Sequence, residues 1–262
     1  AELNTSTEAK THITELKKRL SSSLAATEQQ MIYHSLALNH EHIGDYEQAF
    51  SYFRDSKLAI KHQINYEASK HQIFCQQLIA LSEKIQLTAK NADFSPIFVM
   101  GMPRSGTTLV EKIINQSTEV TGLGELNDIA QLLQSTAASK HVLDIRMIEQ
   151  AFQKFTLDNP LNGYQSRCEG MMTSSRSCDK QPFNFYFIDF ILTAFPEAKI
   201  VCMLRDPVDS CIANYRQLYS PHSAFHHYSY DLQDIAHFYQ DYKLLINHFQ
   251  KKYPNNVMIQ HY

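Results

Sequence analysis

The fold of this chain is decided by residues 96–109, PIFVMGMPRSGTTL. The stretch begins with the apolar run IFVM at residues 97–100, which is short enough to be a strand buried on both faces. The chain then turns through Gly101 and Gly106 into a helical segment over residues 107–116. Successive backbone N–H groups converge in such a loop, and the helix dipole adds its positive end to them. The stretch therefore predicts a cradle for a phosphate-like anion.

The spacing of Gly101 and Gly106 is that of the nucleotide P-loop, in which a lysine follows the second glycine. Here Thr107 occupies that position, and the nearest cation is Arg104, inside the loop. The loop therefore suits a phosphate-like anion but lacks the usual clamp for a triphosphate. A turn of glycine and proline in an unrelated α/β protein is the alternative interpretation.

Composition is that of an ordinary globular protein. The 262 residues can bury a full α/β core, and this length fits one large domain plus a small one. The formal net charge of −3 predicts no general attraction to nucleic acid or to an anionic membrane. No apolar run approaches the roughly 20 residues that span a bilayer, and the first residues, AELNTSTEAKTH, have no signal-peptide core. We expect a soluble, cytoplasmic protein, with room for a targeting segment upstream of this chain.

The cysteines and histidines predict no metal site. The five cysteines are an odd number, and the spacing of Cys168 and Cys178 offers no zinc pattern, so reduced thiols are expected. The segment YSPHSAFHHYS contains His222, His226 and His227, but no carboxylate or cysteine accompanies them at a settled spacing. An exposed lid is the simpler interpretation of that segment.

The N-terminal third of the chain has the pattern of packed helices. Residues 13–90 show helical periodicity with few breakers. Small residues at Ala37 and Ala49 would let two helices approach closely on either side of Gly44, and the offsets around them resemble one tetratricopeptide repeat. One repeat stacks its apolar face on neighbours, so more repeats upstream are expected. A plain helical bundle is the alternative.

Three charged residues stand where predicted strands end, which is where parallel α/β sheets bind ligands. Glu125 follows two glycines at a strand-to-helix turn and is a candidate base, although an acidic helix N-terminus would look the same. Lys180 lies in the polar loop TSSRSCDKQP, where a solvated surface charge is the alternative. Arg205 ends the predicted strand 199–204, and its guanidinium suits a phosphomonoester.

The predicted fold class is α/β: a P-loop-like parallel sheet with flanking helices, preceded by an all-α tetratricopeptide-like segment. We expect a helical segment over residues 1–92 and a second domain over residues 93–262. Further helices are predicted over residues 127–136, 142–155, 161–172, 183–194 and 231–252, and a further strand over residues 257–261.

The loop PRSGTTL resembles the 5′-phosphosulfate loop of sulfotransferases that use 3′-phosphoadenosine 5′-phosphosulfate as donor. Other segments, in the expected order, resemble the branch that carries tetratricopeptide repeats and is similar to protein-tyrosine sulfotransferases: GELN, DKQPFNF, AKIVCMLRDPVDSCIANY, and YDLQDIAHFYQDY through VMIQHY. Together they cover most of the chain. The family's final segment continues as a tyrosine and a glutamate, so the resemblance implies a C-terminally truncated domain that ends at that tyrosine, Tyr262.

The resemblance also implies which residues bind the donor. Where the family adds a serine, this chain has Ala213, so Ser210 one helical turn earlier is the substitute, or the 3′-phosphate is held less tightly. Arg205 would bind the 3′-phosphate, and Tyr262 belongs to the donor site. The residues implied for the 5′-phosphosulfate are Arg104, Ser105, Gly106, Thr107 and Thr108.

By the same resemblance Glu125 is the catalytic base, Lys180 the lysine that stabilises the transition state, and Arg104 a second catalytic cation. The expected activity is transfer of a sulfuryl group to an acceptor hydroxyl without a metal. A protein or peptide tyrosine is favoured, and a saccharide or small hydroxylated metabolite would need the same base. The helical repeats would present a protein partner. The rivals are a P-loop kinase, against which Thr107 argues, and a catalytically impaired tetratricopeptide scaffold, for which Ala213 argues.

Overall fold

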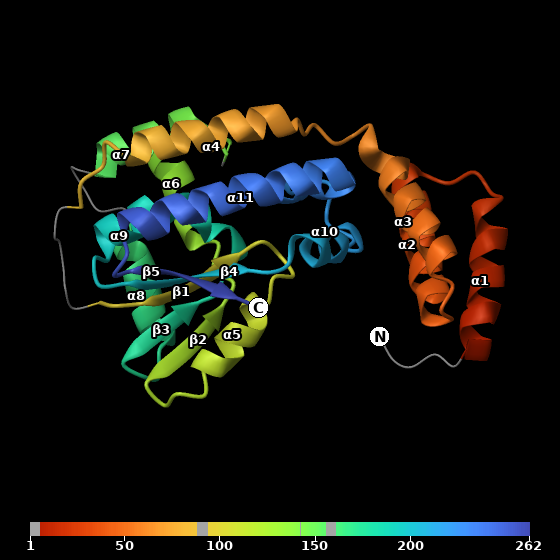
Figure 1. The fold of residues 1–262 in the computed structure, drawn as a ribbon, viewed down its shortest axis with the longest axis horizontal. Helices are drawn as coiled ribbons and strands as arrows, with labels where there is room; N and C mark the ends of the chain where they lie inside the picture. Colours follow the sequence, from red (N-terminus) through yellow and green to blue (C-terminus); the bar gives the residue numbers. More distant parts are fainter. Residues whose placement is uncertain (1–5, 88–93, 142, 156–160) are drawn as a thin grey trace. The chain divides into compact units, whose positions relative to one another are not determined.

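The computed structural model describes residues 6–87, 94–141, 143–155 and 161–262, which form two compact units (Figure 1). The first unit comprises Ala1–Glu67 and Ile212–Ile235, and the second comprises Ala68–Cys211 and Ala236–Tyr262. The predicted boundary between residues 92 and 93 lies outside the described residues.

The first unit is built on three helices, α1 (Ser6–Leu20), α2 (Ala26–His42) and α3 (Tyr46–Lys61). Both predicted small residues, Ala37 and Ala49, are buried, as the close approach of α2 and α3 requires. The Ser56 hydroxyl crosses from α3 to α2 and donates a hydrogen bond of 2.9 Å to the Gln30 carbonyl. This helix pair agrees with the helical segment expected from the sequence, whereas a tetratricopeptide array stays a prediction.

The histidine-rich segment also belongs to the first unit, and part of it forms the 3₁₀ helix η2 (Ala224–Tyr230). Its interpretation as an exposed lid is wrong for Tyr228 and Ser229, which are buried. The Tyr228 hydroxyl donates to Asn214 Oδ1 at 2.8 Å, and the Tyr230 hydroxyl donates to the Tyr219 carbonyl at 2.7 Å. These tyrosines fix the segment by hydrogen bonds that a sequence pattern does not reveal.

The second unit contains a sheet of five parallel strands in the order β2-β3-β1-β4-β5. The mixed α/β architecture with a parallel sheet, preceded by helices, confirms the predicted fold class. In chain order the strands are β1 (Ile97–Gly101), β2 (Val120–Gly124), β3 (Arg176–Asp179), β4 (Lys199–Leu204) and β5 (Val257–His261).

Strand β3 corrects the sequence analysis, which assigned TSSRSCDKQP to a polar loop. Within that segment Arg176–Asp179 pairs with both neighbours, with Cys178 opposite Ile97 of β1 and Arg176 opposite Val120 of β2. Ser177 and Cys178 are fully buried. The segment has no apolar run because small side chains face the covering layers, so the strand is stabilised by pairing on both sides rather than by its own hydrophobicity.

The helices of the second unit flank this sheet. The predicted helix over residues 183–194 starts as a 3₁₀ helix, η1, with proline at its N-terminus, before it becomes α9. The elements are α4 (Ala68–Ser82), α5 (Thr107–Ile114), α6 (Asp128–Ala137), α7 (Ile145–Phe155), α8 (Asn162–Met171), η1 (Pro182–Phe187) and α9 (Ile188–Ala194), together with parts of α10 (Pro207–Tyr215) and α11 (Leu232–Lys252). Among the described residues, no helix combines the length and the apolar character needed to cross a bilayer.

The two faces of the sheet are covered differently. On one face the Tyr242 hydroxyl of α11 donates to the Met203 carbonyl of β4 at 2.7 Å, and α4 lies on the far side of α11 (Figure 1). A second cluster, which includes Val99 and Val201, packs against Val110 and Ile114 of α5. The helix that follows the predicted anion loop is thus anchored to the sheet by its inner side.

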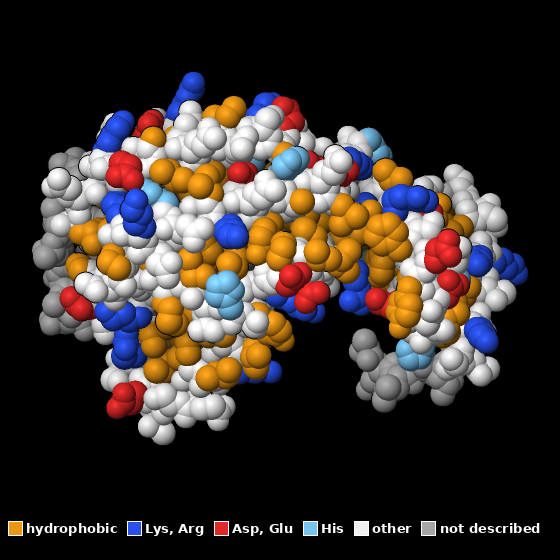
Figure 2. Space-filling view, viewed as in Figure 1, with side chains coloured by type: hydrophobic (Ala, Val, Ile, Leu, Met, Phe, Trp, Pro, Cys, Tyr) orange, Lys and Arg blue, Asp and Glu red, His pale blue; other side chains and the backbone are white. Residues whose placement is uncertain are grey.

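The outer side of α5 is apolar as well. Leu109 and Ile113 are four residues apart and remain 49% and 61% exposed. Figure 2 shows hydrophobic side chains gathered over this helix on one face of the second unit. The position of α5 is therefore set by its inner contacts and by the loop before it.

Asp189 ties α9 to the end of α11 and provides a test of the packing. Its Oδ1 accepts hydrogen bonds from Lys252 Nζ at 3.0 Å and from the Tyr253 hydroxyl at 2.5 Å, and its side chain is 5% exposed. Since Asp189→Ala removes the carboxylate partner of both groups, we expect the free energy of unfolding to fall by about 3 kcal/mol. Urea denaturation measures the change. Lys251→Ala, on the exposed side of α11, is the control and should stay within about 0.5 kcal/mol; an equal effect of both changes would contradict the assignment.

Candidate active site

The carboxyl ends of the parallel strands bring the predicted site residues to one edge of the sheet. Across the sheet, Glu125 follows β2, Lys180 follows β3, residues 102–106 follow β1, Arg205 follows β4 and Tyr262 follows β5. All of these residues belong to the second unit. In open α/β sheets this edge is where ligands bind.

The loop between β1 and α5 has the backbone shape of an anion cradle. Arg104 and Gly106 adopt positive φ values of 67° and 99°, and Ser105 N donates to the Met102 carbonyl at 3.2 Å. Gly106 is the residue at the N-cap of α5, so the amides of Thr107 and Thr108 begin the helix. The first amides of a helix have no acceptor within it, and they lie at the positive end of its dipole.

The glycine before this loop is required by close packing. A Cβ atom at Gly101 would lie 2.8 Å from Ser105 Oγ and 3.0 Å from Met203 Cβ. Ser105 is 1% exposed, and its hydroxyl has no hydrogen-bond partner among the described residues. A buried hydroxyl without a partner, set beside free helix amides, fits an oxygen of a bound anion.

Arg205 is held against the other side of the loop. Its Nη1 donates to the Arg104 carbonyl at 3.3 Å, and its Nη2 donates to Asp209 at 3.0 Å. Asp206 caps α10 as predicted, since its Oδ1 accepts from the amides of Val208 and Asp209 at 2.8 and 3.1 Å. The capped helix and the strand end together fix where the guanidinium lies.

Tyr262 completes this side of the site. Its backbone N–H donates to the Leu204 carbonyl at 2.9 Å, and its ring centroid lies 4.9 Å from the Arg205 guanidinium. The ring also packs over Gly106, where a Cβ atom would overlap it. Ser210 is buried on α10, and its part in donor binding stays a prediction.

Glu125 and Lys180 form an ion pair at the ends of the neighbouring strands β2 and β3. The Lys180 side chain is 8% exposed, whereas that of Glu125 is 55% exposed. The backbone fixes both, because Lys180 N donates to the Gly124 carbonyl at 2.9 Å and Gly124 N donates to Glu111 Oε1 at 3.2 Å. The solvated surface lysine considered in the sequence analysis is thus excluded, and a buried cation faces an accessible carboxylate.

Comparison with known proteins identifies the family. The model described as the sulfotransferase family matches residues 96–262, which is more than half of the chain and contains every site residue described above. The chain belongs to the sulfotransferase family.

Three relatives are similar to this sulfotransferase-family chain. A protein of Aquifex aeolicus (strain VF5) described as uncharacterized is 29% identical over 81% of the chain. A protein-tyrosine sulfotransferase of Drosophila melanogaster and protein-tyrosine sulfotransferase 1 of Danio rerio are 26% and 27% identical, each over 44% of the chain. The chain spans 29%, 24% and 34% of the lengths of these three proteins.

A buried carboxyl that the sequence analysis did not single out, Asp179, supports both charged residues of the sulfotransferase site. It precedes Lys180 at the end of β3 and is fully buried. It accepts a hydrogen bond of 3.0 Å from the Tyr164 hydroxyl and one from the Leu126 backbone N–H, directly after Glu125. Burial raises its pKa to about 7. The one sequence signal was an aspartate inside DKQP, next to the candidate lysine.

A group of metal-type ligands lies elsewhere in the second unit. The ligand atoms of His71, Cys75 and Asp241 lie within 4.8 Å of one another, and all three residues are buried. Both imidazole nitrogens are already engaged, Nδ1 with Asp241 and Nε2 with the Tyr186 hydroxyl, each at 2.7 Å. These contacts satisfy the imidazole as a hydrogen-bonded core network, and the absence of a metal from the reaction stays a prediction.

The loop geometry is tested by Gly106→Ala. Alanine strains a backbone with a φ of 99°, and its Cβ would displace the Tyr262 ring. We expect a loss of about 1–2 kcal/mol in the free energy of unfolding. The matched control is Gly163→Ala in α8, where nothing lies within 4 Å of the added atom. Denaturant titration of both variants decides, and equal stabilities would show that the loop tolerates a side chain.

Asp179 predicts a pH dependence of stability. Its pKa is about 7 in the folded chain against an ordinary 3.8, so between these values the folded state binds the additional proton. The free energy of unfolding should therefore fall as pH rises from 5 to 8, by up to about 3 kcal/mol from this group. Asp179→Asn should flatten that part of the profile. Urea midpoints measured from pH 5 to 8 test this, and parallel profiles of variant and wild type would refute it.

Proposed function

We propose that the chain transfers a sulfuryl group from 3′-phosphoadenosine 5′-phosphosulfate to an acceptor hydroxyl, with a protein or peptide tyrosine as the favoured acceptor. The observation that carries this proposal is the Glu125–Lys180 ion pair at the sheet edge that also carries the anion loop and Arg205. Membership in the family supports the reaction class, and the two relatives named as protein-tyrosine sulfotransferases favour the acceptor.

The residues present fit the donor. The 5′-phosphosulfate would be held by the loop amides, the unpartnered Ser105 hydroxyl and the cation of Arg104. The Arg205 guanidinium would hold the 3′-phosphate by paired hydrogen bonds, with Ser210 as a further donor. Tyr262 contacts both Gly106 and Arg205, so its ring would flank the bound nucleotide. The remaining predicted donor residues are the N-terminal residues of α5, Thr107 and Thr108.

In the proposed step, a bond forms between the acceptor oxygen and sulfur while the bond from sulfur to the oxygen of the 5′-phosphate breaks. The acceptor proton passes to the Glu125 carboxylate. Negative charge develops on the departing bisphosphate, where Lys180, Arg104 and the loop amides stabilise it. General-base action of this kind contributes about 10²–10⁴-fold in rate.

The unequal exposure of the ion pair suits these roles. Lys180 donates to Oε1 of Glu125, which leaves Oε2 for an acceptor hydroxyl. Because the glutamate is half exposed, an acceptor can reach it, while the buried lysine keeps a fixed position and direction. The same contact that orients the base thus holds the cation at the reacting group.

Glu125→Gln tests the assignment of the base. We expect donor binding to be retained and the rate of sulfuryl transfer to fall by about 10²–10⁴-fold, since the amide accepts no proton. Transfer of labelled sulfate from the donor to a tyrosine peptide, and to a saccharide in parallel, measures the rate and the acceptor preference. Glu119→Gln, at an exposed glutamate before β2, is the matched control. Full turnover of Glu125→Gln when chemistry limits the rate would refute the role.

Donor binding is measured separately by calorimetric titration of 3′-phosphoadenosine 5′-phosphate into the wild type, Arg104→Ala and the chain extended past Tyr262. We expect binding by the wild type, loss in the variant and no binding of ATP with Mg²⁺. Binding without turnover by the extended chain would favour the second candidate, an impaired scaffold, which the replacement of the family's serine by Ala213 supports.

A further inference from the structure

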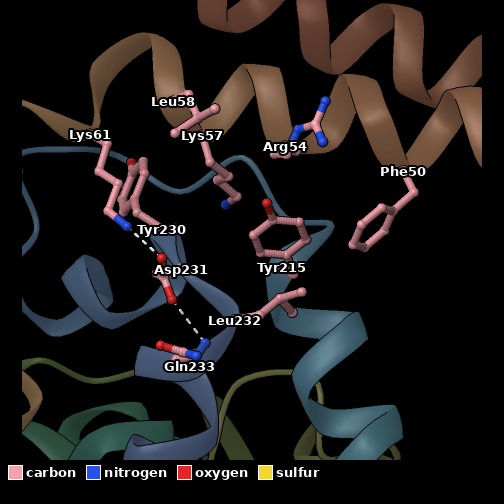
Figure 3. A pocket seen from close by; sticks show the side chains of 10 residues that line it. All are labelled: Phe50, Arg54, Lys57, Leu58, Lys61, Tyr215, Tyr230, Asp231, Leu232 and Gln233. Atoms are coloured by element: carbon pink, nitrogen blue, oxygen red, sulfur yellow. Dashed lines mark hydrogen bonds and ion pairs between the residues drawn. The ribbon is translucent and has the colours of Figure 1, made fainter.

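The first unit contains a pocket of about 350 Å³ of its own (Figure 3). One wall is helix α3, which contributes Phe50, Lys57 and Leu58. The facing wall is formed by the end of α10 and the residues that lead into α11, with Tyr215 and Tyr230. The proposed transfer reaction uses none of these side chains.

Lys57 is the unusual member of this pocket. The residue is 2% exposed, and its ammonium lies 4.9 Å from the centroid of the Tyr230 ring and 5.7 Å from that of Tyr215. Nζ donates to the Gln217 carbonyl at 2.7 Å, but among the described residues no carboxylate pairs with it. The nearby Asp231 is engaged by Lys61 instead. A buried cation without an anion is unfavourable, which suggests that the anion arrives with a ligand.

The shape and lining of the pocket indicate the size of that ligand. Pockets of a few hundred Å³ that are mostly apolar, with a few polar groups, are typical of small-molecule sites. Here the rings of Phe50, Tyr215 and Tyr230 supply flat apolar surface, and Phe50 is still 45% exposed. Leu58, 56% exposed, lies at the pocket as well. A molecule with a flat or aliphatic body and one anionic group matches this lining.

We propose that the first unit binds a small organic anion, with its apolar body among Phe50, Tyr215 and Tyr230 and its charged group against Lys57. The site goes beyond the proposed sulfuryl transfer and does not depend on it, because its residues belong to the first unit and the donor residues to the second. The binding of the anion follows from an unpaired cation and ring surfaces already in place.

The charges around Lys57 make this binding dependent on pH. Burial lowers the pKa of Lys57 to about 7. Burial, followed by the charges of Lys57 and Arg216, lowers the pKa of His34 to about 4, and burial raises that of Tyr215 to about 12. The groups that face Lys57 from the elements packed around it are His34, Arg54, Lys61, Tyr215, Arg216 (paired with Glu41), Tyr219, Tyr230 and Asp231. Of the groups with a displaced pKa, Lys57 is the one that changes charge near neutral pH, so binding of an anion should take up a proton.

The test is calorimetric titration of the full chain with 2-naphthoate, with uncharged 2-naphthamide as the matched ligand, in buffers that differ in ionisation enthalpy. We expect naphthoate to bind in the micromolar to low millimolar range, as for small ligands. Affinity should be constant below pH 6.5 and weaken about tenfold for each pH unit above 7, with proton uptake near pH 7. Naphthamide should bind at least about tenfold more weakly.

Three variants locate the site. Lys57→Met should remove both the preference for the anion and the proton uptake. Leu58→Glu places a negative charge at an exposed position of the pocket and should weaken naphthoate about tenfold without disturbing the core. Lys17→Met, which removes an exposed lysine of the same unit, should leave binding unchanged. Thermal unfolding followed by circular dichroism establishes that each variant is folded.

Four results would overturn the proposal. Equal affinities for naphthoate and naphthamide would remove the role of Lys57, and equal affinities for naphthoate and inorganic sulfate would remove the role of the rings. Tighter binding of an acidic pentapeptide than of naphthoate would assign the pocket to a peptide segment. The absence of binding by any of these probes at millimolar concentration would leave Lys57 as a structural residue.

Discussion

The parallel pairing of β3 with its two neighbours is the constraint on which the proposed active site depends. It places Lys180 beside Glu125, although the two residues are 55 positions apart in the sequence. It also buries Asp179, whose carboxyl reaches the peptide that follows Glu125. A change in the register of β3 by one residue would turn Asp179 outward and Lys180 inward, because side chains alternate along a strand. The chemistry of the site is therefore set by backbone hydrogen bonds.

The anion side of the same edge rests on a different physical principle. The loop after β1 offers amides and a buried hydroxyl, whereas Arg205 offers a planar cation held by Asp209 and the Arg104 carbonyl. Amides recognise an anion without bringing a full charge into the site, and a guanidinium adds that charge at a fixed place. A chain with a net charge of −3 can thus gather Arg104, Lys180 and Arg205 along one edge without a basic surface overall.

The sequence was most informative where local chemistry determines structure. The apolar run of β1, the glycines around Ser105 and the Asp206 cap each specify their own conformation within a few residues, and the structure has these elements as expected. Strand β3 was missed because its residues carry no hydrophobic pattern and its stability comes from segments far away in the sequence. For the same reason Asp179 went unnoticed, since the burial that raises its pKa is a tertiary property.

Lysine shows most clearly what a sequence cannot tell. Lys57 and Lys180 are both buried, yet the sequence presents each as an ordinary charge in a polar setting. Lys180 has a carboxylate in contact, so its charge is balanced and its position is fixed for chemistry. Lys57 has tyrosine rings and a carbonyl instead, so its charge is only partly compensated and its pKa falls to about 7. The partner, rather than the residue type, decides whether a buried cation orients a base or waits for an anion.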